Sequence, residues 1–252
     1  LLEVNPRASR TVPFMSKVTG VPMVELATRV ALGETLAGMG WPGGLLAPRP
    51  LVAVKAPVFS TMKLRGVDPM LGPAMQSTGE VIGIHADPRI ALAKALVAAS
   101  LRPPVAPDTG AMALLSLADG DKPHLAELAT RLARGGYRFC ATHGTAVALR
   151  VLGHEVEEVA RVGEAAGSGR SVLDAVRSGE VLLVVNTPSP ESRPMSDAGL
   201  IRMAALGEGI LCLTSIDTAL AAVAALDPAL AGRLDEVRPL GEWLELDASL
   251  AA

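Results

Sequence analysis

The sequence predicts an α/β protein whose second half is a Rossmann-like three-layer αβα domain with a five-stranded parallel sheet. Two observations predict this fold class. After residue 110, five apolar runs alternate with five stretches in which apolar residues recur at helical spacing. Such alternation is typical of a parallel sheet with helices on both faces. In addition, 50% of the residues are hydrophobic but only 2% are aromatic, so Ala, Leu and Val should form the core.

Each expected strand of the second half is followed by its helix, which gives a domain of roughly 140 residues. The first of these helices should end at the glycine pair 135–136, because glycine stops helices. In chain order, the expected strand and helix ranges are 111–117 and 121–134, 137–141 and 144–152, 156–162 and 171–177, 181–185 and 197–206, and 210–213 and 217–226.

The first half is less regular. Its apolar start reads as a strand already under way, so we expect the chain to begin inside a domain. Three prolines fall within residues 101–110, and proline disfavours both helix and sheet. We therefore predict two domains, at residues 1–104 and 108–252. Within the first, the expected elements are a helix at 21–36, a loop at 41–50, a strand at 51–58, a turn-rich stretch at 66–83 and a helix at 88–99.

Composition excludes several classes of function. The net charge of −3 is spread along the chain and leaves no basic footprint for nucleic acid and no polybasic membrane anchor. No apolar run reaches the ~18 residues of a membrane span, and no signal peptide is visible. The two cysteines, Cys140 and Cys212, lie in apolar runs and should be buried free thiols. This usage fits a reducing cytoplasm.

A candidate metal and phosphate site lies at the start of the chain. Glu3 and Asn5 are two residues apart, so on a strand they present a carboxylate and an amide oxygen on one face. Such hard oxygens suit Mg²⁺, and the guanidinium groups of Arg7 and Arg10 suit phosphate oxygens. Phosphoryl transfer needs both. An ordinary polar strand end with surface arginines remains the alternative.

A second candidate lies where a strand passes into a helix at residues 142–145. Helix N-termini bind anions through their free N–H groups. Thr142 and Thr145 would add hydroxyl donors, and Gly144 would let a ligand approach the backbone. The alternative is a threonine that only caps the helix.

Other strand ends should converge on the same edge of the sheet, where parallel α/β folds bind ligands. Hydroxyls, amides and cations gathered there suit a phosphate-bearing ligand. His143 has no evident carboxylate partner in the sequence, so binding is favoured over catalysis at this edge. The further residues expected there are Ser116, Lys122, Arg161, Asn186 and Thr187. There is no G-x-G-x-x-G after the first strand, no Walker A motif and no zinc-ligand spacing.

Several segments resemble the large subunit of carbamoyl phosphate synthases. The resemblance spans nearly the whole chain and implies the end of the second ATP-grasp domain, followed by an allosteric domain like methylglyoxal synthase (MGS-like). The longest segment is EVNPRASRTVPF at residues 3–14. The others are Lys17, GVP at 20–22, GVDP at 66–69, LGP at 71–73, MQSTGEV at 75–81, Ser116, DGDK at 119–122 and ATHGT at 141–145.

The resemblance implies a ligase that makes carbamoyl phosphate from bicarbonate, glutamine-derived ammonia and two ATP, for pyrimidine and arginine biosynthesis in the cytoplasm. Glu3 and Asn5 then resemble ligands of the Mg²⁺ or Mn²⁺ bound with ATP. Arg7 and Arg10 resemble catalytic contacts to phosphate or to the carbamate-derived substrate. The implied partners are the rest of the large subunit and a glutaminase small subunit, so the chain alone should be inactive.

The resemblance also implies an allosteric nucleotide, UMP or IMP, in the second domain. Two positions there depart from the family: Arg161 stands where the family often has Lys, and Pro188 where a Thr is common. Ala56 replaces a Glu linked to ornithine sensing, and residues 212–215 lack the Tyr-Asp-Thr-Thr of ornithine-responsive members, so we expect no ornithine activation. The residues that match the family's effector site are Ser116, Lys122, Thr142, Thr145, Asn186 and Thr187.

Two alternative functions remain open. One is a stand-alone nucleotide-binding module that uses the first half as a docking surface. The other is a lyase acting on a phosphorylated triose, as methylglyoxal synthase does. Such a lyase needs a carboxylate base beside its ligand, and the sequence places only Glu191 near the expected site.

Overall fold

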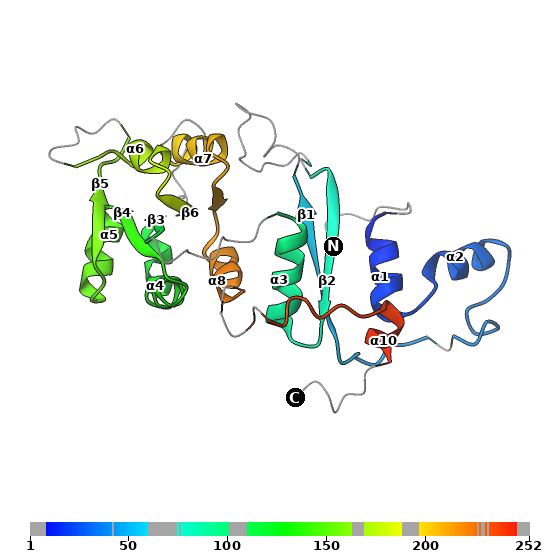
Figure 1. The fold of residues 1–252 in the computed structure, drawn as a ribbon. Helices are drawn as coiled ribbons and strands as arrows, with labels where there is room; N and C mark the ends of the chain where they lie inside the picture. The colour runs from blue at the N-terminus through cyan, green and yellow to red at the C-terminus, as the bar shows by residue number, and fades with distance from the viewer. Residues whose placement is uncertain are drawn as a thin grey trace.

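The computed structural model contains two separate β-sheets, one in each half of the chain (Figure 1). None of its described helices has the length and apolar character needed to cross a membrane. The structure describes residues 9–41, 43–59, 75, 77–100, 110–162, 169–187, 197–225, 227, 230 and 232–245.

In the first half, one helix covers one face of a two-stranded antiparallel sheet. This helix, α3, begins at Pro88 after Asp87, whose carboxylate accepts a hydrogen bond from the Arg89 N–H as an N-cap. Ala56, Ala95 and Ala99 form the small core between helix and sheet. The elements are α1 (Thr11–Thr19), α2 (Met23–Ala31), β1 (Val52–Val58), β2 (Gly79–His85) and α3 (Pro88–Ala98).

Two expectations for this half are corrected, and one helix was not predicted. The helix expected at 21–36 is the shorter α2, because Gly33 turns the chain out of the helix with a φ of 98°. Part of the expected turn-rich stretch is β2. Its Gly83 is needed because α3 lies so close that a Cβ there would sit 2.1 Å from the Ala91 carbonyl oxygen. Helix α1 is not among the elements predicted from the sequence.

In the second half, the predicted five-stranded parallel sheet is confirmed, with strand order β5-β4-β3-β6-β7. The first expected helix starts as a 3₁₀ turn that contains Pro123 and becomes α-helical only at Leu125. The elements are β3 (Met112–Ser116), η2 (Asp119–His124), α4 (Leu125–Arg134), β4 (Arg138–Thr142), α5 (His143–Val151), β5 (Val156–Val159), α6 (Val172–Arg177), β6 (Val181–Asn186), α7 (Asp197–Gly207), β7 (Leu211–Leu213) and α8 (Ile216–Ala224).

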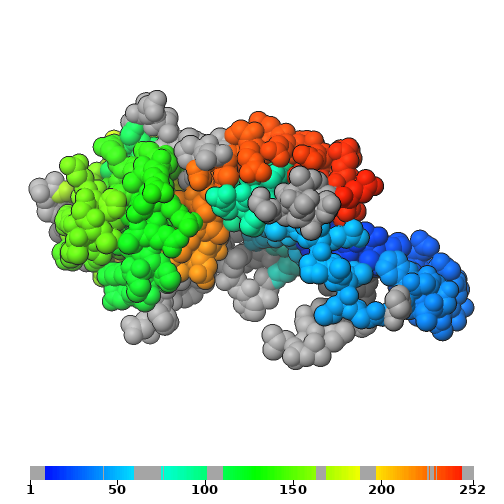
Figure 2. All heavy atoms as spheres, turned by 90° about the horizontal axis from the view of Figure 1, so that it is seen from below, coloured from blue at the N-terminus to red at the C-terminus, as the bar shows by residue number. Residues whose placement is uncertain are grey.

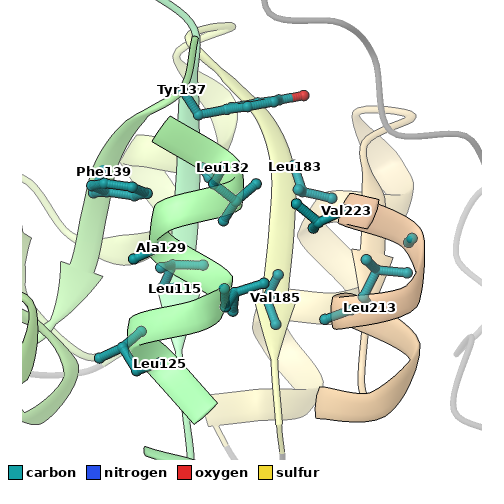
Figure 3. Packing of buried hydrophobic residues seen from close by; sticks show 14 of the residues in the cluster. Leu115, Leu125, Ala129, Leu132, Tyr137, Phe139, Leu183, Val185, Leu213 and Val223 are labelled. Carbon is teal, nitrogen blue, oxygen red and sulfur yellow. The ribbon is translucent and has the colours of Figure 1, made fainter. Parts of the chain in front are cut away.

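The core lies on both faces of this sheet, as three layers require. Leu115 and Val185 point to the face that α4 and α8 cover, and Figure 3 shows them in one cluster with Leu125 and Leu132 of α4 and Val223 of α8. Their strand neighbours, such as Leu114 and Val184, point to the opposite face because successive side chains of a strand alternate. That face is covered by residues of α6 and α7, including Val172, Val176, Ile201 and Ala205.

The cysteines are both free thiols. Cys140 is buried in the second of these clusters, and burial raises the pKa of its thiol to about 12. Cys212 is partly buried against the same cluster, and burial raises the pKa of its thiol to about 12, so the expectation of two buried thiols holds fully only for Cys140.

After α8 the chain returns to the first half. Residues 232–245, which we call the strap, run across β2 and α3 and end in the short helix α10 (Leu240–Leu244), which packs beside α1 (Figure 1). Figure 2 shows the orange and red atoms of this part of the chain lying against the cyan atoms of the first half. The predicted domain boundary at residues 104–108 lies outside the described residues.

Candidate functional site

A cavity of about 440 Å³ lies at the carboxyl edge of the five-stranded sheet. It sits over the ends of β4, β3 and β6, where the strand order reverses direction and α/β sheets commonly bind ligands. The seven residues that the sequence assigns to the effector site all line it, namely Ser116, Lys122, Thr142, Thr145, Arg161, Asn186 and Thr187.

Two threonines hold the loop after β3 and remain able to donate. Thr145 Oγ1 accepts a hydrogen bond from the Leu117 N–H at 3.0 Å, and Thr187 Oγ1 accepts one from the Ala118 N–H at 2.9 Å. A hydroxyl that accepts from a backbone N–H still has its own hydrogen to give. Both hydroxyls can therefore donate to an anionic ligand in the cavity.

The N-terminus of α5 opens on the same cavity. Thr142 is the N-cap residue, but its side chain makes no capping hydrogen bond. Its hydroxyl instead donates to Ser116 Oγ at 3.2 Å. The alternative of a threonine that only caps the helix is therefore not supported, and the first N–H groups of α5 are left for an anion.

Lys122 supplies a cation at this helix terminus. Its Nζ lies 2.6 Å from Asp119 Oδ1, and this hydrogen bond is the main cause that lowers the pKa of the Asp119 carboxyl. The Asp119 side chain is 93% exposed, so the pair is worth little and can be exchanged for a ligand phosphate. Gly144 leaves room for the lysine, because a Cβ there would lie 3.0 Å from Lys122 Nζ.

Asn186 carries the clearest sign of an absent ligand partner. The residue is 2% exposed, and no donor in the described part of the chain reaches its Oδ1. A buried acceptor without a partner costs about 1–3 kcal/mol, so a donor on a ligand would be favoured there. Sequence reasoning placed Asn186 at the edge but could not show that its oxygen is unpaired.

Two further observations lie beyond the sequence analysis. Asp119 and Asp197 both line the cavity, although the sequence suggested no carboxylate beside the ligand except Glu191, which lies outside the described residues. His143 does have a carboxylate partner, because Glu158 on the neighbouring strand places Oε1 2.6 Å from its Nδ1. Hydrogen bonds from His143 and Arg150 lower the pKa of Glu158.

The candidate site at the start of the chain is described only in part, since Glu3, Asn5 and Arg7 lie outside the described residues. Arg10 is exposed, and its Nη2 donates to the Thr78 carbonyl at 3.4 Å. It lines a depression of about 180 Å³ together with two lysines and a glutamate, Lys17, Lys55 and Glu80.

Lys55 makes two polar contacts at this depression. Its Nζ lies 3.3 Å from Glu80 Oε1 and 3.4 Å from Thr11 Oγ1. Three cations against one carboxylate leave the depression with an excess of positive charge, which favours an anion there.

A parallel sheet with a polar cavity at its carboxyl edge is the architecture of an α/β ligand-binding domain. The family model of the MGS-like domain matches residues 124–214, and the carbamoyl-phosphate synthase L chain, ATP binding domain, matches residues 1–39. With the relatives described next, these matches show that the chain corresponds to a C-terminal part of the carbamoyl phosphate synthase large chain.

The curated relatives carry that name. The chain is 50% identical over 252 residues to the carbamoyl phosphate synthase large chain of Thermomicrobium roseum. The aligned residues make up 100% of the chain and 22% of the relative. It is 45% identical over 218 residues to the carbamoyl phosphate synthase large chain of Clostridium perfringens strain 13. Here the aligned residues make up 86% of the chain and 20% of the relative. The chain thus spans about a fifth of the length of these relatives.

Proposed function

We propose that the chain is the effector-binding end of an ATP-dependent carbamoyl phosphate synthase and that its second half binds a nucleoside monophosphate, UMP or IMP. One observation carries this proposal: seven side chains chosen from the sequence converge on a single polar cavity that holds an unpaired buried acceptor. The cavity volume of about 440 Å³ suits a small ligand of this size.

The donors of the cavity suit the phosphate of such a ligand. The N-terminus of α5, the Lys122 ammonium, the Arg161 guanidinium and the hydroxyls of Thr145 and Thr187 all offer N–H or O–H groups. Asn186 Oδ1, which needs a donor, suits a sugar hydroxyl of the same ligand. Lyase chemistry is the alternative, because Asp119 and Asp197 line the same cavity; turnover of dihydroxyacetone phosphate by the chain would distinguish it from regulation.

The start of the chain would complete the ATP site of the enzyme. In this proposal Glu3 and Asn5 hold the Mg²⁺ or Mn²⁺ that neutralises the ATP phosphates, while Arg7 and Arg10 contact the phosphate or the carbamate. The excess positive charge around Arg10 supports an anionic substrate there. The rest of the large chain and a glutaminase small subunit would supply the remaining parts, so the chain alone should make no carbamoyl phosphate.

Titration calorimetry of the chain with UMP and IMP tests the effector site. Changing Lys122→Ala removes a charge-assisted hydrogen bond and should weaken binding by about 1.5–3 kcal/mol, which is roughly tenfold to hundredfold in Kd. Arg177→Ala, which removes a cation from α6 outside the cavity, is the matched control and should bind as the unchanged chain does.

Uridine without its phosphate serves as the ligand control. If uridine binds as tightly as UMP, or if Lys122→Ala leaves the affinity unchanged, the phosphate is not held where we propose. Absence of heat with either nucleotide at millimolar concentration would contradict the effector site itself.

A further inference from the structure

The strap joins the end of the second half to the helix that directly follows Arg10. We propose that the strap is the mechanical link through which occupancy of the effector cavity alters the position of α1, and with it the candidate catalytic arginine. The inference rests on the nucleotide binding proposed above. The supporting observation is a series of contacts that leads from Lys122 at the cavity to α1.

The first step runs from the cavity to α8. Lys122 lies on η2, which leads directly into α4. Arg131, in the last turn of α4, donates from Nη1 to the Leu220 carbonyl of α8 at 3.2 Å. Helix α8 also packs against α3 of the first half. Three successive backbone hydrogen bonds then lead from the end of α8 into the strap, from the Asp227 N–H to the Ala224 carbonyl, from the Leu230 N–H to the Asp227 carbonyl and from the Arg233 N–H to the Leu230 carbonyl. A shift of η2 on ligand binding can therefore act on the strap through α8.

The middle of the strap is fixed by a buried histidine. His85 is 2% exposed, and its Nδ1 accepts a hydrogen bond from the Asp87 N–H at 2.8 Å. The ring proton is therefore on Nε2, which donates to Glu236 Oε2 at 3.0 Å. Lys94 of α3 donates to the backbone carbonyl of Glu236. Both contacts join the strap to the sheet and helix of the first half.

Trp243 anchors the end of the strap. It is 5% exposed, and its ring packs against the His85 ring with centroids 5.2 Å apart. Lys94 Nζ and the Arg238 guanidinium lie 5.4 and 5.3 Å from the Trp243 ring centroid. These cation–π contacts and the burial make Trp243 the side chain that holds α10 in place.

Arg49 completes the link to α1. Its Nη1 donates to the Leu244 carbonyl of α10 at 3.0 Å, and its Nη2 donates to the Thr19 carbonyl at the end of α1 at 3.2 Å. One guanidinium therefore joins the last turns of both helices. Because Arg10 immediately precedes α1, displacement of the strap would move this arginine relative to the substrate.

Hydrogen exchange of the chain, with and without saturating UMP, tests the link. In the unchanged chain we expect UMP to slow exchange in α5, beside the cavity, and also by about fivefold or more in α1 and α10, a typical size for coupling between sites. In Trp243→Ala we expect the slowing in α5 to remain and the slowing in α1 to disappear. Val237→Ala, which changes a strap residue that is 89% exposed, should respond as the unchanged chain does.

Arg49→Ala provides a second variant that leaves the Trp243 packing in place. It removes only the bridge between α10 and α1 and should also abolish the response of α1. An α1 response that persists in both variants, or is absent from the unchanged chain while α5 responds, would overturn the proposed link. If α5 itself does not respond to UMP, the proposed effector site fails instead.

Discussion

At the scale of single residues, the hydroxyl of Thr145 and the amide of Asn186 contribute to the structure of the cavity in opposite ways. Thr145 accepts from the Leu117 N–H and so fixes the loop that leads to Lys122, while its own hydrogen remains for a ligand. Asn186 is the opposite case, because its side-chain oxygen is buried and accepts no hydrogen bond in the described part of the protein. Thr145 therefore stabilises the fold without a ligand, whereas in the proposed function the Asn186 oxygen gains a partner only when a ligand binds.

Changing Thr145→Val tests this double role. The variant keeps the shape of the side chain but leaves the buried Leu117 N–H without its acceptor, so we expect a loss of about 1–3 kcal/mol in the free energy of unfolding. Thr145→Ser keeps the hydroxyl and should lose much less. Urea denaturation of both variants measures the difference, and equal stabilities would show that the hydrogen bond contributes nothing.

The convergence of the cavity residues could be predicted from the sequence because parallel strands share one carboxyl edge. Ser116, Thr142 and Asn186 each end an apolar run, and such runs predict strands well. The partner of His143 could not be predicted, because Glu158 is fifteen positions away and lies near it only through the pairing of β4 with β5.

At the scale of secondary structure, the two halves differ in how far local sequence determines them. The strands of the second half are buried apolar runs, and their helices have clear stop signals, so their order could be predicted. Strand β2 could not, since it contains two glycines, which are depleted in strands. The reason for Gly83 is the close approach of α3, which is a contact between distant residues.

Changing Gly83→Ala tests the packing of α3 on β2. The added Cβ would meet backbone atoms of α3, at 2.1 Å from the Ala91 carbonyl oxygen and 2.5 Å from the Ala95 nitrogen, and neither can turn away as a side chain could. We expect a loss of stability of about 1–3 kcal/mol, as for other overpacked cores. Thermal unfolding measures the loss.

The matched control for this change lies on the same strand. In Gly79→Ala the new Cβ would meet Val58 at 3.5 Å, an ordinary contact, so its melting temperature should stay close to that of the unchanged chain. If the Gly83→Ala variant has the same melting temperature as the control, α3 does not lie as close to the sheet as the structure has it.

At the scale of the whole molecule, the chain closes back on its beginning. The strap runs from the second half past His85 of β2 and Lys94 of α3 to α1, which directly follows Arg10 in the sequence. The first half is therefore contacted by Glu236 of the strap, which lies 151 residues after His85 and 142 residues after Lys94 in the chain. This path places the candidate effector cavity and the candidate catalytic arginine at the two ends of one series of contacts.

Acid should detach the strap from the first half. The hydrogen bond from His85 is the main cause that lowers the pKa of Glu236 below its usual 4.5, and Arg233 adds to it. Because the folded-state pKa is the lower one, the unfolded or detached strap takes up the proton first. The contribution of Glu236 is therefore fully present above its usual pKa and is lost as the pH falls from about 4.5 through the lowered folded-state value.

Fluorescence of Trp243 in a Trp41→Phe background reports on the strap, because detachment exposes a ring that is otherwise 5% exposed. We expect its emission to shift to the red as the pH falls below about 4.5, the usual pKa of the Glu236 carboxyl. Glu236→Gln, which has no proton to take up at this position, should lose most of that acid shift, whereas Asp235→Asn, beside it on the strap and exposed, should keep it. If the shift is the same in all three proteins, His85 and Glu236 do not hold the strap, and the link from the effector cavity to α1 would have to depend on Trp243 and Arg49 alone.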